Sequence, residues 1–302
     1  MTNFLKELER EIRHNTRELE REEQLARLQA VAEHYSGPDE VISSLEMERR
    51  IRREGAPEYI KTGIEGLDKI IHGFRKKQLI IISAPPKAGK TSFCLHLTNL
   101  LKDHNPLWIP LEQDIEEIVS VNVERGREVP LFYAPEQNKY PALTDWIENK
   151  IVESIAKYDT KIVFIDHLSF VRPSNTTEKE RYVQVGRAVE ALREIGKKIG
   201  IPIVLVAHIR KSDPTEIPTV EDLYESGMIH QLADTVIMLW REAYKENKEL
   251  HYSNNVLLSV QANRRHGTTG NVRFRYENFN YVEDEMIVFK HENEKVRDPN
   301  VF

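Results

Sequence analysis

Residues 79–92 read LIIISAPPKAGKTS, an apolar run followed at once by a loop rich in Pro, Ala and Gly. Four consecutive apolar residues, Leu79 to Ile82, are typical of a strand that is buried on both faces. The closing Gly89-Lys90-Thr91 matches the end of the Walker A motif, whose first glycine is replaced here by Ala84. The stretch therefore predicts a strand, a phosphate-binding loop and a helix that begins near Thr91.

The residue types of this loop suit a nucleoside triphosphate. A triphosphate needs several backbone N–H donors, and a loop that opens a helix supplies them. Gly89 allows close approach of the backbone, Lys90 neutralises the β- and γ-phosphates, and the Thr91 hydroxyl binds Mg²⁺. We expect ATP and Mg²⁺ as cofactors, bound along Ala84, Pro85, Pro86, Lys87, Ala88, Gly89, Lys90, Thr91 and Ser92. An ordinary turn with a stray Gly-Lys-Thr is disfavoured, because the strand and the helix stand where the motif requires them.

Further apolar runs follow at intervals that leave room for helices. These runs lie at residues 107–109, 162–165, 203–206, 235–239, 257–260 and 272–276. Apolar strands that alternate with helical stretches are typical of an α/β fold, with a mostly parallel sheet and helices on both faces. The last two runs are predicted to form an antiparallel pair. The sequence thus predicts an α/β domain over residues 58–290.

Polar residues follow three of these runs. Asp166 ends the run at 162–165, which is the Walker B arrangement, where a carboxylate holds Mg²⁺ directly or through water. Glu112 is a candidate to orient and deprotonate an attacking water, and a surface glutamate near a helix start is the alternative. His208 is either a sensor of the γ-phosphate or a helix-capping or solvent-facing histidine. The residues alone leave both choices open.

Composition excludes few functions. The chain has 302 residues, of which 40% are hydrophobic and 30% charged, a profile typical of a soluble globular protein. Apolar runs of 18 residues are absent, so no membrane partner is expected. The charged N-terminal stretch and the single cysteine, Cys94, predict a cytoplasmic location. The net charge of −6 argues weakly against a protein that nucleic acid coats, but not against a few basic loops inside a channel.

The segments outside residues 58–290 are predicted to lack a core of their own. Apolar residues recur at helical spacing through residues 1–35, and a second helix is expected from about Asp39 to Arg53. Residues 1–57 are therefore interpreted as a helical arm or linker. This arm is either a surface hairpin or a segment that packs on a neighbouring subunit. Residues 291–302 read as a polar tail.

From residue 60 to residue 285 the sequence resembles the DnaB-type hexameric helicases, including the related phage and mitochondrial ring helicases. The phosphate loop of that family often begins with Ala and carries Pro two positions later, as Ala84 and Pro86 do here. Further matches stand in the expected order at TGIEGLD (62–68), Leu111-Glu112, Asp166-His167-Leu168, SGMIHQLAD (226–234) and NRRHGTTG (263–270). The resemblance implies a RecA-like core with Glu112 as catalytic residue. It also implies an ATP-driven ring that works on single-stranded DNA during replication, in a bacterial or phage-infected cell.

The resemblance further implies an arginine finger supplied by a neighbouring subunit, and hence a homo-oligomer, expected to be a hexamer. Arg265 and Arg264 are the candidates for this catalytic arginine. The family usually has a lysine two residues earlier, where this chain has Asn263 or Ala262. Arg265 is favoured because the following His-Gly-Thr-Thr-Gly then aligns without a gap. The family's bacterial members also carry a larger N-terminal domain, and the helix at 39–53 is expected to replace the one that docks on the next subunit.

Two loops are the expected contacts for DNA. The first runs from roughly Arg172 to Arg181, and the second runs from roughly Arg210 to Glu221. The basic residues of these loops are Lys179, Arg181, Arg210 and Lys211. They either bind DNA phosphates without recognising the bases or are ordinary surface charges. A primase or a helicase loader is a further candidate partner. Two rival functions remain open, namely a RecA-type recombinase that coats DNA, and a helicase loader or regulatory ATPase scaffold.

Overall fold

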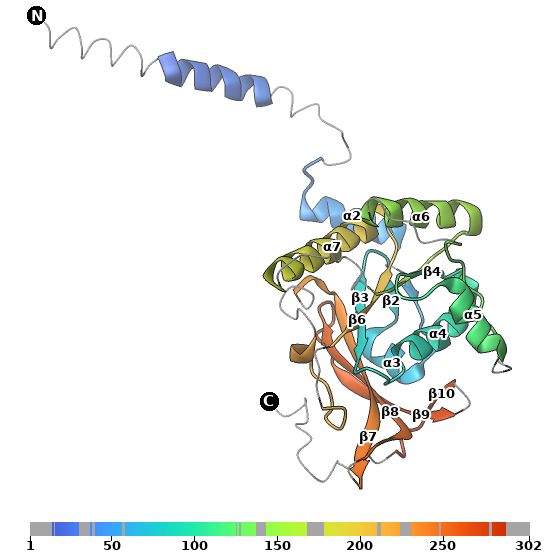
Figure 1. The fold of residues 1–302 in the computed structure, drawn as a ribbon. Coiled ribbons are helices and arrows are strands. Elements are labelled where there is room, and N and C mark those ends of the chain that lie inside the picture. Colours follow the sequence, from blue (N-terminus) through green and yellow to red (C-terminus); the bar gives the residue numbers. More distant parts are fainter. Residues whose placement is uncertain are drawn as a thin grey trace, which may run out of the picture. The chain divides into compact units, whose positions relative to one another are not determined.

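A sheet of eight strands forms the centre of residues 57–302 as far as the structure describes them, in the order β10-β9-β8-β7-β3-β6-β5-β4 (Figure 1). The five parallel strands are β3 (Leu79–Ala84), β4 (Leu107–Pro110), β5 (Val163–Asp166), β6 (Ile203–His208) and the first part of β7 (Thr235–Glu246). Three antiparallel strands extend the sheet beyond β7, and they are β8 (Glu249–Asn263), β9 (Gly270–Glu277) and β10 (Asn280–Glu283). The predicted α/β class with a mostly parallel sheet is confirmed.

The computed structural model describes residues 14, 16–29, 37, 40–55, 58–124, 126, 128–136, 143–167, 178–209, 213–223, 231–247, 249–277 and 280–287. The chain divides into two units, Met1–Ala56 and Pro57–Phe302. In the first unit, residues 16–29 are helical and α2 spans Ser44–Glu54. The remainder of the helix expected at 1–35, and the tail expected at 291–302, lie outside the described residues.

Alternating side chains of β3 show why this strand is buried on both faces. Ile80 and Ile82 pack with Phe93 and Leu97 of helix α4 (Lys90–Leu100), and α3 (Glu65–Ile71) covers the same face. Leu79 and Ile81 point to the other face, where α6 (Leu143–Tyr158) and α7 (Glu178–Ile199) pack. A strand with apolar side chains on both faces needs a helix layer on each of them. This packing fixes the carboxyl end of β3, where the phosphate loop begins.

Shorter elements accompany the sheet and its helix layers, among them the 3-10 helices at Lys102–His104 and Val220–Asp222. Strands β1 (Tyr59–Ile60) and β2 (Phe74–Arg75), which precede and follow α3 in the sequence, form a small antiparallel pair. Helix α5 (Ile115–Glu124) follows β4 and buries Ile118. None of the helices in the described part of the chain combines the length and apolar composition that a bilayer-spanning helix requires.

The strands at the antiparallel end are longer than their apolar runs predict. β7 continues to Glu246 and pairs with β8 as far as Glu246 opposite Glu249, well past the apolar residues 235–239. Hairpin pairing satisfies the backbone groups there, so the side chains need not be apolar. The short strand β10 was not predicted, because Tyr281 is its only buried residue.

Two expectations about helices were wrong in their bounds. The helix expected from about Asp39 begins at Ser44, because the Ser43 hydroxyl accepts a hydrogen bond from the Glu46 N–H (3.1 Å) and caps it. Lys179 and Arg181 were expected in a loop, but their backbone belongs to the first turn of α7. Buried Val185, Val189 and Leu192 recur at helical spacing and hold this helix on the sheet.

The central packing gives a first prediction. Phe93 is fully buried, and its ring packs edge-to-face against Phe274 and Tyr281 at centroid distances of 6.1 and 5.2 Å. Phe93→Ala is expected to lower the free energy of unfolding by about 3–5 kcal/mol, because it removes buried area and leaves a cavity. Leu100→Ala, a control on the same helix with 41% of Leu100 exposed, is expected to cost about 1 kcal/mol or less. Urea denaturation measures both, and equal losses would contradict the packing described.

Candidate active site

The phosphate loop begins where β3 ends and opens directly into α4. Gly89 is the residue before this helix and has φ +94°, a left-handed conformation that glycine adopts without strain. A Cβ atom at Gly89 would lie 2.7 Å from the Tyr281 hydroxyl oxygen, so any larger residue would displace that ring. The Tyr281 hydroxyl donates a hydrogen bond to the Gly89 carbonyl (3.1 Å). Tyr281, for which no role was predicted from the sequence, thus supports the loop from β10.

Thr91 and Asp166 meet across the end of the sheet. The Thr91 hydroxyl donates to Asp166 Oδ2 at 2.9 Å. Burial raises the pKa of Asp166, while the Thr91 hydrogen bond and the Lys90 charge lower it. The other oxygen, Asp166 Oδ1, is buried and has no hydrogen-bond partner among the described residues. A hydroxyl and a carboxylate oxygen with spare lone pairs are hard oxygen ligands, so this pair fits Mg²⁺.

Lys90 lies on the first turn of α4 and faces the end of β6. Its Nζ atom is 3.2 Å from His208 Nδ1. Burial lowers the pKa of Lys90, and the carboxylates of Asp166 and Glu112 oppose that shift. Burial, together with the Lys90 charge, lowers the pKa of His208 to about 4. At neutral pH His208 is therefore an uncharged imidazole beside the Lys90 Nζ atom.

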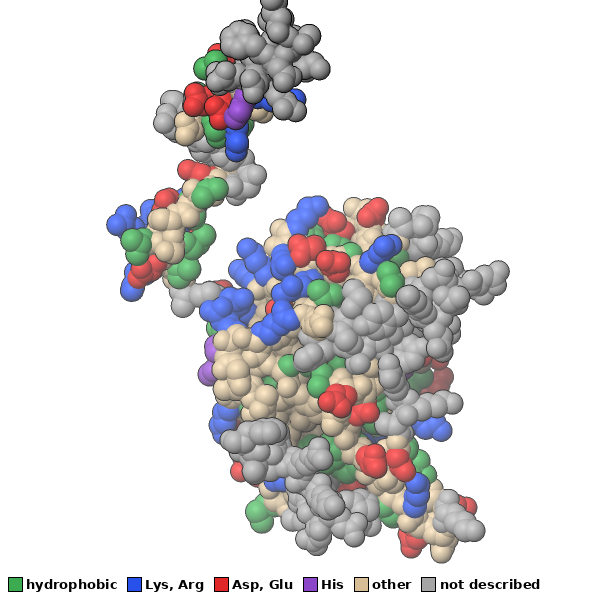
Figure 2. All heavy atoms as spheres, turned by 90° about the vertical axis from the view of Figure 1, so that its left-hand side faces the viewer, with side chains coloured by type: hydrophobic (Ala, Val, Ile, Leu, Met, Phe, Trp, Pro, Cys, Tyr) green, Lys and Arg blue, Asp and Glu red, His purple; other side chains and the backbone are tan. Residues whose placement is uncertain are grey.

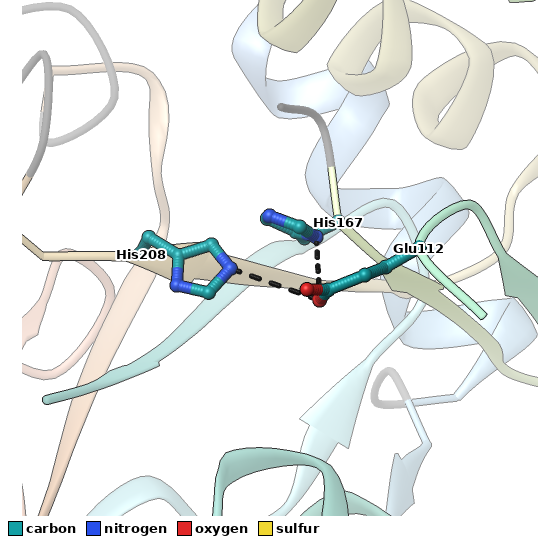
Figure 3. A group of neighbouring side chains, drawn as sticks. All are labelled: Glu112, His167 and His208. Atoms are coloured by element: carbon teal, nitrogen blue, oxygen red, sulfur yellow. Dashed lines mark ion pairs between the residues drawn. The ribbon is translucent and has the colours of Figure 1, made fainter. Parts of the chain in front are cut away.

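Glu112 projects from the residues after β4 toward two histidines (Figure 3). Its Oε2 atom lies 3.1 Å from His167 Nδ1 and 3.8 Å from His208 Nε2. The Glu112 side chain is 47% exposed, whereas that of His167 is only 6% exposed. No role for His167 was predicted from the sequence, where its position next to Asp166 was the available signal. The structure therefore brings together Lys90, Thr91, Glu112, Asp166 and His208, and adds His167 to them.

The two candidate finger arginines differ in their surroundings. They lie in the turn between β8 and β9. The Arg264 guanidinium donates to the Gln231 carbonyl, and the Arg264 N–H donates to the Asp234 carbonyl (2.9 Å). The Arg265 side chain is exposed and forms no hydrogen bond or ion pair with another described residue. Arg264 is thus held by its own chain, while Arg265 is exposed and unbonded among the described residues.

Asn263 stands two residues before Arg265 and is bonded within its own chain. Only 6% of Asn263 is exposed, and its amide donates to the Thr268 hydroxyl (3.0 Å) and the Ile70 carbonyl (3.4 Å). The Thr268 hydroxyl also donates to the Ile70 carbonyl, at 2.7 Å. A buried ammonium at position 263 would need an anionic partner, whereas the amide finds neutral ones. Asn263 therefore anchors the turn to α3.

Most of the basic side chains expected to contact DNA are not among those that the structure describes. Arg210 and Lys211 lie outside the described residues, and only the backbone of Lys179 and Arg181 is described. On the face of the larger unit that Figure 2 shows, Lys and Arg side chains gather near the top with Asp and Glu side chains among them. Mixed charges that form ion pairs are ordinary on a protein surface, and the described chain has one between Lys198 and Glu148 (2.6 Å). This face therefore gives no argument for DNA contact.

The fold is shared with known structures, and two of them are similar to this chain over most of its length. The chain is similar to a solved ATPase domain, with a TM-score of 0.62 and 20% identity, over 80% of this chain and 97% of that one. It is also similar to a DnaB-like replicative helicase solved in a study of its interactions with primase, with a TM-score of 0.60 and 20% identity, over 86% and 71% of the two chains. These likenesses confirm the predicted RecA-like fold.

Sequence comparison gives the family. A probable replicative DNA helicase of Trieres chinensis is 26% identical over 72% of this chain and 55% of its own length. The replicative DNA helicase DnaB of Geobacillus stearothermophilus is 23% identical over 74% of this chain and 56% of its own length. The chain thus spans about half the length of these curated relatives. The family model for the DnaB-like helicase C terminal domain matches residues 59–131 and 110–282. Since this match covers most of the chain and every residue of the candidate site, the chain belongs to the DnaB-like helicase C-terminal domain family.

Proposed function

We propose that this chain is the ATP-hydrolysing motor of a DNA helicase that translocates on single-stranded DNA during replication. The observation that supports this most strongly is the meeting of Lys90, Thr91, Glu112, Asp166 and His208 at the carboxyl ends of four neighbouring parallel strands. A phosphate loop, a metal-binding pair and a carboxylate base are the parts that hydrolysis of a triphosphate needs.

Each side chain has a proposed part in that reaction. The N-terminus of α4 and Lys90 bind the phosphates of ATP. Thr91 and Asp166 hold Mg²⁺, which supplies charge stabilisation at the phosphates when it is bound. Glu112 accepts a proton from the attacking water, since its carboxylate is half exposed and lies beside the site. His208 contacts Lys90. A bound phosphate that attracts Lys90 would break this contact, and the loss of the contact would pass the state of the nucleotide to the end of β6 and the residues after it.

The complete active site is proposed to form between two subunits. Arg265 is exposed and unbonded within the described chain, so it is the better candidate to reach the γ-phosphate of a neighbour. Repeating that head-to-tail contact closes a ring, proposed to be a hexamer. The arm at residues 1–57 is proposed to pack on the neighbouring subunit, and residues 58–290 to form the motor. Lys179, Arg181, Arg210 and Lys211 remain the proposed DNA contacts.

Partners and location follow from the same proposal. One of the structural relatives was studied for its interactions with primase, so a primase is a reasonable partner here, as is a helicase loader. The proposed location is the cytoplasm, where such a motor meets replicating DNA. The rival proposals are a DNA-coating recombinase and a loader or scaffold ATPase, neither of which a specific contact in the structure favours.

The test is ATP hydrolysis with and without single-stranded DNA, with the mass of the assembly measured in the same nucleotide. We expect turnover that DNA stimulates, in a discrete hexamer. A long filament on DNA would favour the recombinase instead. Turnover that is absent, or that is indifferent to DNA, would contradict the helicase proposal and favour the loader or scaffold.

A further inference from the structure

Glu112, His167 and His208 form a compact group of potential metal ligands (Figure 3). Each side chain follows or ends a different strand, namely β4, β5 and β6, so the sheet itself sets their spacing. One carboxylate oxygen and two imidazole nitrogens lie within 4.8 Å of one another. The histidine rings meet edge-to-face with their centroids 3.9 Å apart.

This donor set differs in kind from the pair that fits Mg²⁺. Mg²⁺ takes oxygen ligands, whereas two imidazoles with one carboxylate are typical ligands of Zn²⁺ and similar borderline cations. Ligand atoms about 2.0–2.1 Å from a tetrahedral ion stand roughly 3.3 Å apart. The two distances from Glu112 Oε2, 3.1 and 3.8 Å, lie on either side of that spacing. The two histidine nitrogens lie within 4.8 Å of each other. The more exposed Glu112 and His208 side chains therefore rotate to reach tetrahedral spacing around an ion.

We propose that Glu112, His167 and His208 bind Zn²⁺ or a similar borderline cation in the nucleotide-free protein, and that this cation inhibits ATP hydrolysis. His167 is buried and is the fixed ligand, whereas the more exposed Glu112 and His208 side chains rotate to reach the ion. The fourth position remains open to water, because Glu112 and His208 face the accessible side of the group. Binding stands on the geometry alone, whereas inhibition rests on the proposed function, in which Glu112 and His208 act on ATP.

Lys90 is the neighbour that limits the affinity. Its Nζ atom is 3.2 Å from His208 Nδ1, the ring nitrogen opposite the one that faces Glu112. An ion on Nε2 leaves the proton of the neutral ring on Nδ1, so the Lys90 ammonium can no longer donate there. The ammonium also repels a dication bound on the other side of the same ring, although the nearby carboxylate of Asp166 offsets part of this charge. Binding is therefore weaker than at a four-ligand structural zinc site, and it is reversible.

Calorimetric titration of the nucleotide-free full chain with ZnCl₂ tests binding. The wild type is expected to bind one equivalent, and Glu112→Gln and His167→Ala each to weaken binding at least about tenfold through the loss of a ligand. His251→Ala is the matched control, because His251 stacks on Tyr244 away from this group, and it should bind as the wild type does. Lys90→Met should bind Zn²⁺ more tightly than the wild type, a result that an incidental site elsewhere would not give. Circular dichroism checks each fold, and His208→Ala replaces His167→Ala if the latter does not fold.

Turnover of MgATP is measured on the same preparations, with and without one equivalent of Zn²⁺. Loss of turnover that a chelator reverses is the expected result. Stoichiometric binding that survives both Glu112→Gln and His167→Ala, or no binding by the wild type, would overturn the site. Zinc binding in a chain that shows no ATP hydrolysis would leave the site standing and contradict the proposed function instead. Zinc binding with undiminished turnover would overturn the inhibition.

Discussion

Lys90→Ala is expected to lower ATP turnover by about 10²–10³-fold, the usual scale for removing one preorganised donor from a transition state. Lys90 is the cation of the phosphate loop, held between His208 and the carboxylates of Asp166 and Glu112. Its charge balances the negative charge that the phosphates bring, and alanine offers no replacement. Phosphate release under saturating MgATP measures the effect.

The fold should survive this substitution. Burying the Lys90 ammonium opposes folding, as its lowered pKa indicates, so its removal is expected to leave the urea midpoint unchanged or raised. Lys76→Ala is the control, because Lys76 is exposed and precedes β3 at the opposite end from the phosphate loop, and it should keep full turnover. Undiminished turnover in Lys90→Ala would remove the phosphate loop from the proposed mechanism.

The parts of the site that could be predicted from sequence are those set by one strand and its next few residues. Apolar runs predicted β3, β4, β5 and β6, and the residues after them were the candidates Lys90, Glu112, Asp166 and His208. Parallel strands place their carboxyl ends at one edge, so the residues that follow them meet there. Local pattern and fold class together were therefore enough to bring these four side chains into one site.

Contacts between distant segments could not be predicted in this way. Tyr281 bonds to the Gly89 carbonyl across 192 positions of the chain, and Asn263 bonds to the Ile70 carbonyl across 193. Neither residue carries a local signal, because an isolated Tyr or Asn suits many environments. The role of His167 depends on how β4 and β6 flank β5, which only the assembled sheet shows. The predicted start of α2 was wrong for a different reason. The cap at Ser43 places the first helical residue at Ser44, five residues after the predicted Asp39.

Arg265→Ala is expected to lower turnover by about 10³–10⁵-fold while ATP still binds. Arg265 is exposed on the turn after β8 and is not held by the described part of its own chain, so it is available to act at a neighbour's site. The phosphate loop, Thr91 and Asp166 are untouched by this change, and binding of a fluorescent ATP analogue should be nearly unchanged. Phosphate release and analogue binding, measured on one preparation, separate the two effects.

Arg264→Ala is the matched control. Its guanidinium donates to the Gln231 carbonyl, so its loss should cost stability, about 1 kcal/mol, and spare turnover. Normal turnover in Arg265→Ala together with lost turnover in Arg264→Ala would transfer the proposed role to Arg264. Normal turnover in both variants would exclude an arginine of this turn from the reaction.

Mixing two inactive variants tests whether Arg265 acts across subunits. Lys90→Ala lacks the phosphate-loop cation but keeps Arg265, while Arg265→Ala keeps the loop and lacks the arginine. If the site lies between subunits, an Arg265→Ala subunit supplies an intact phosphate loop and a neighbouring Lys90→Ala subunit supplies Arg265. The site between these two subunits is then complete, and the mixture should regain turnover that neither variant has alone. If both groups act within one subunit, no pairing restores a site, and the mixture stays inactive. Exchange of subunits, followed by mass, must accompany the measurement, so that an inactive mixture reflects the site and not unmixed rings.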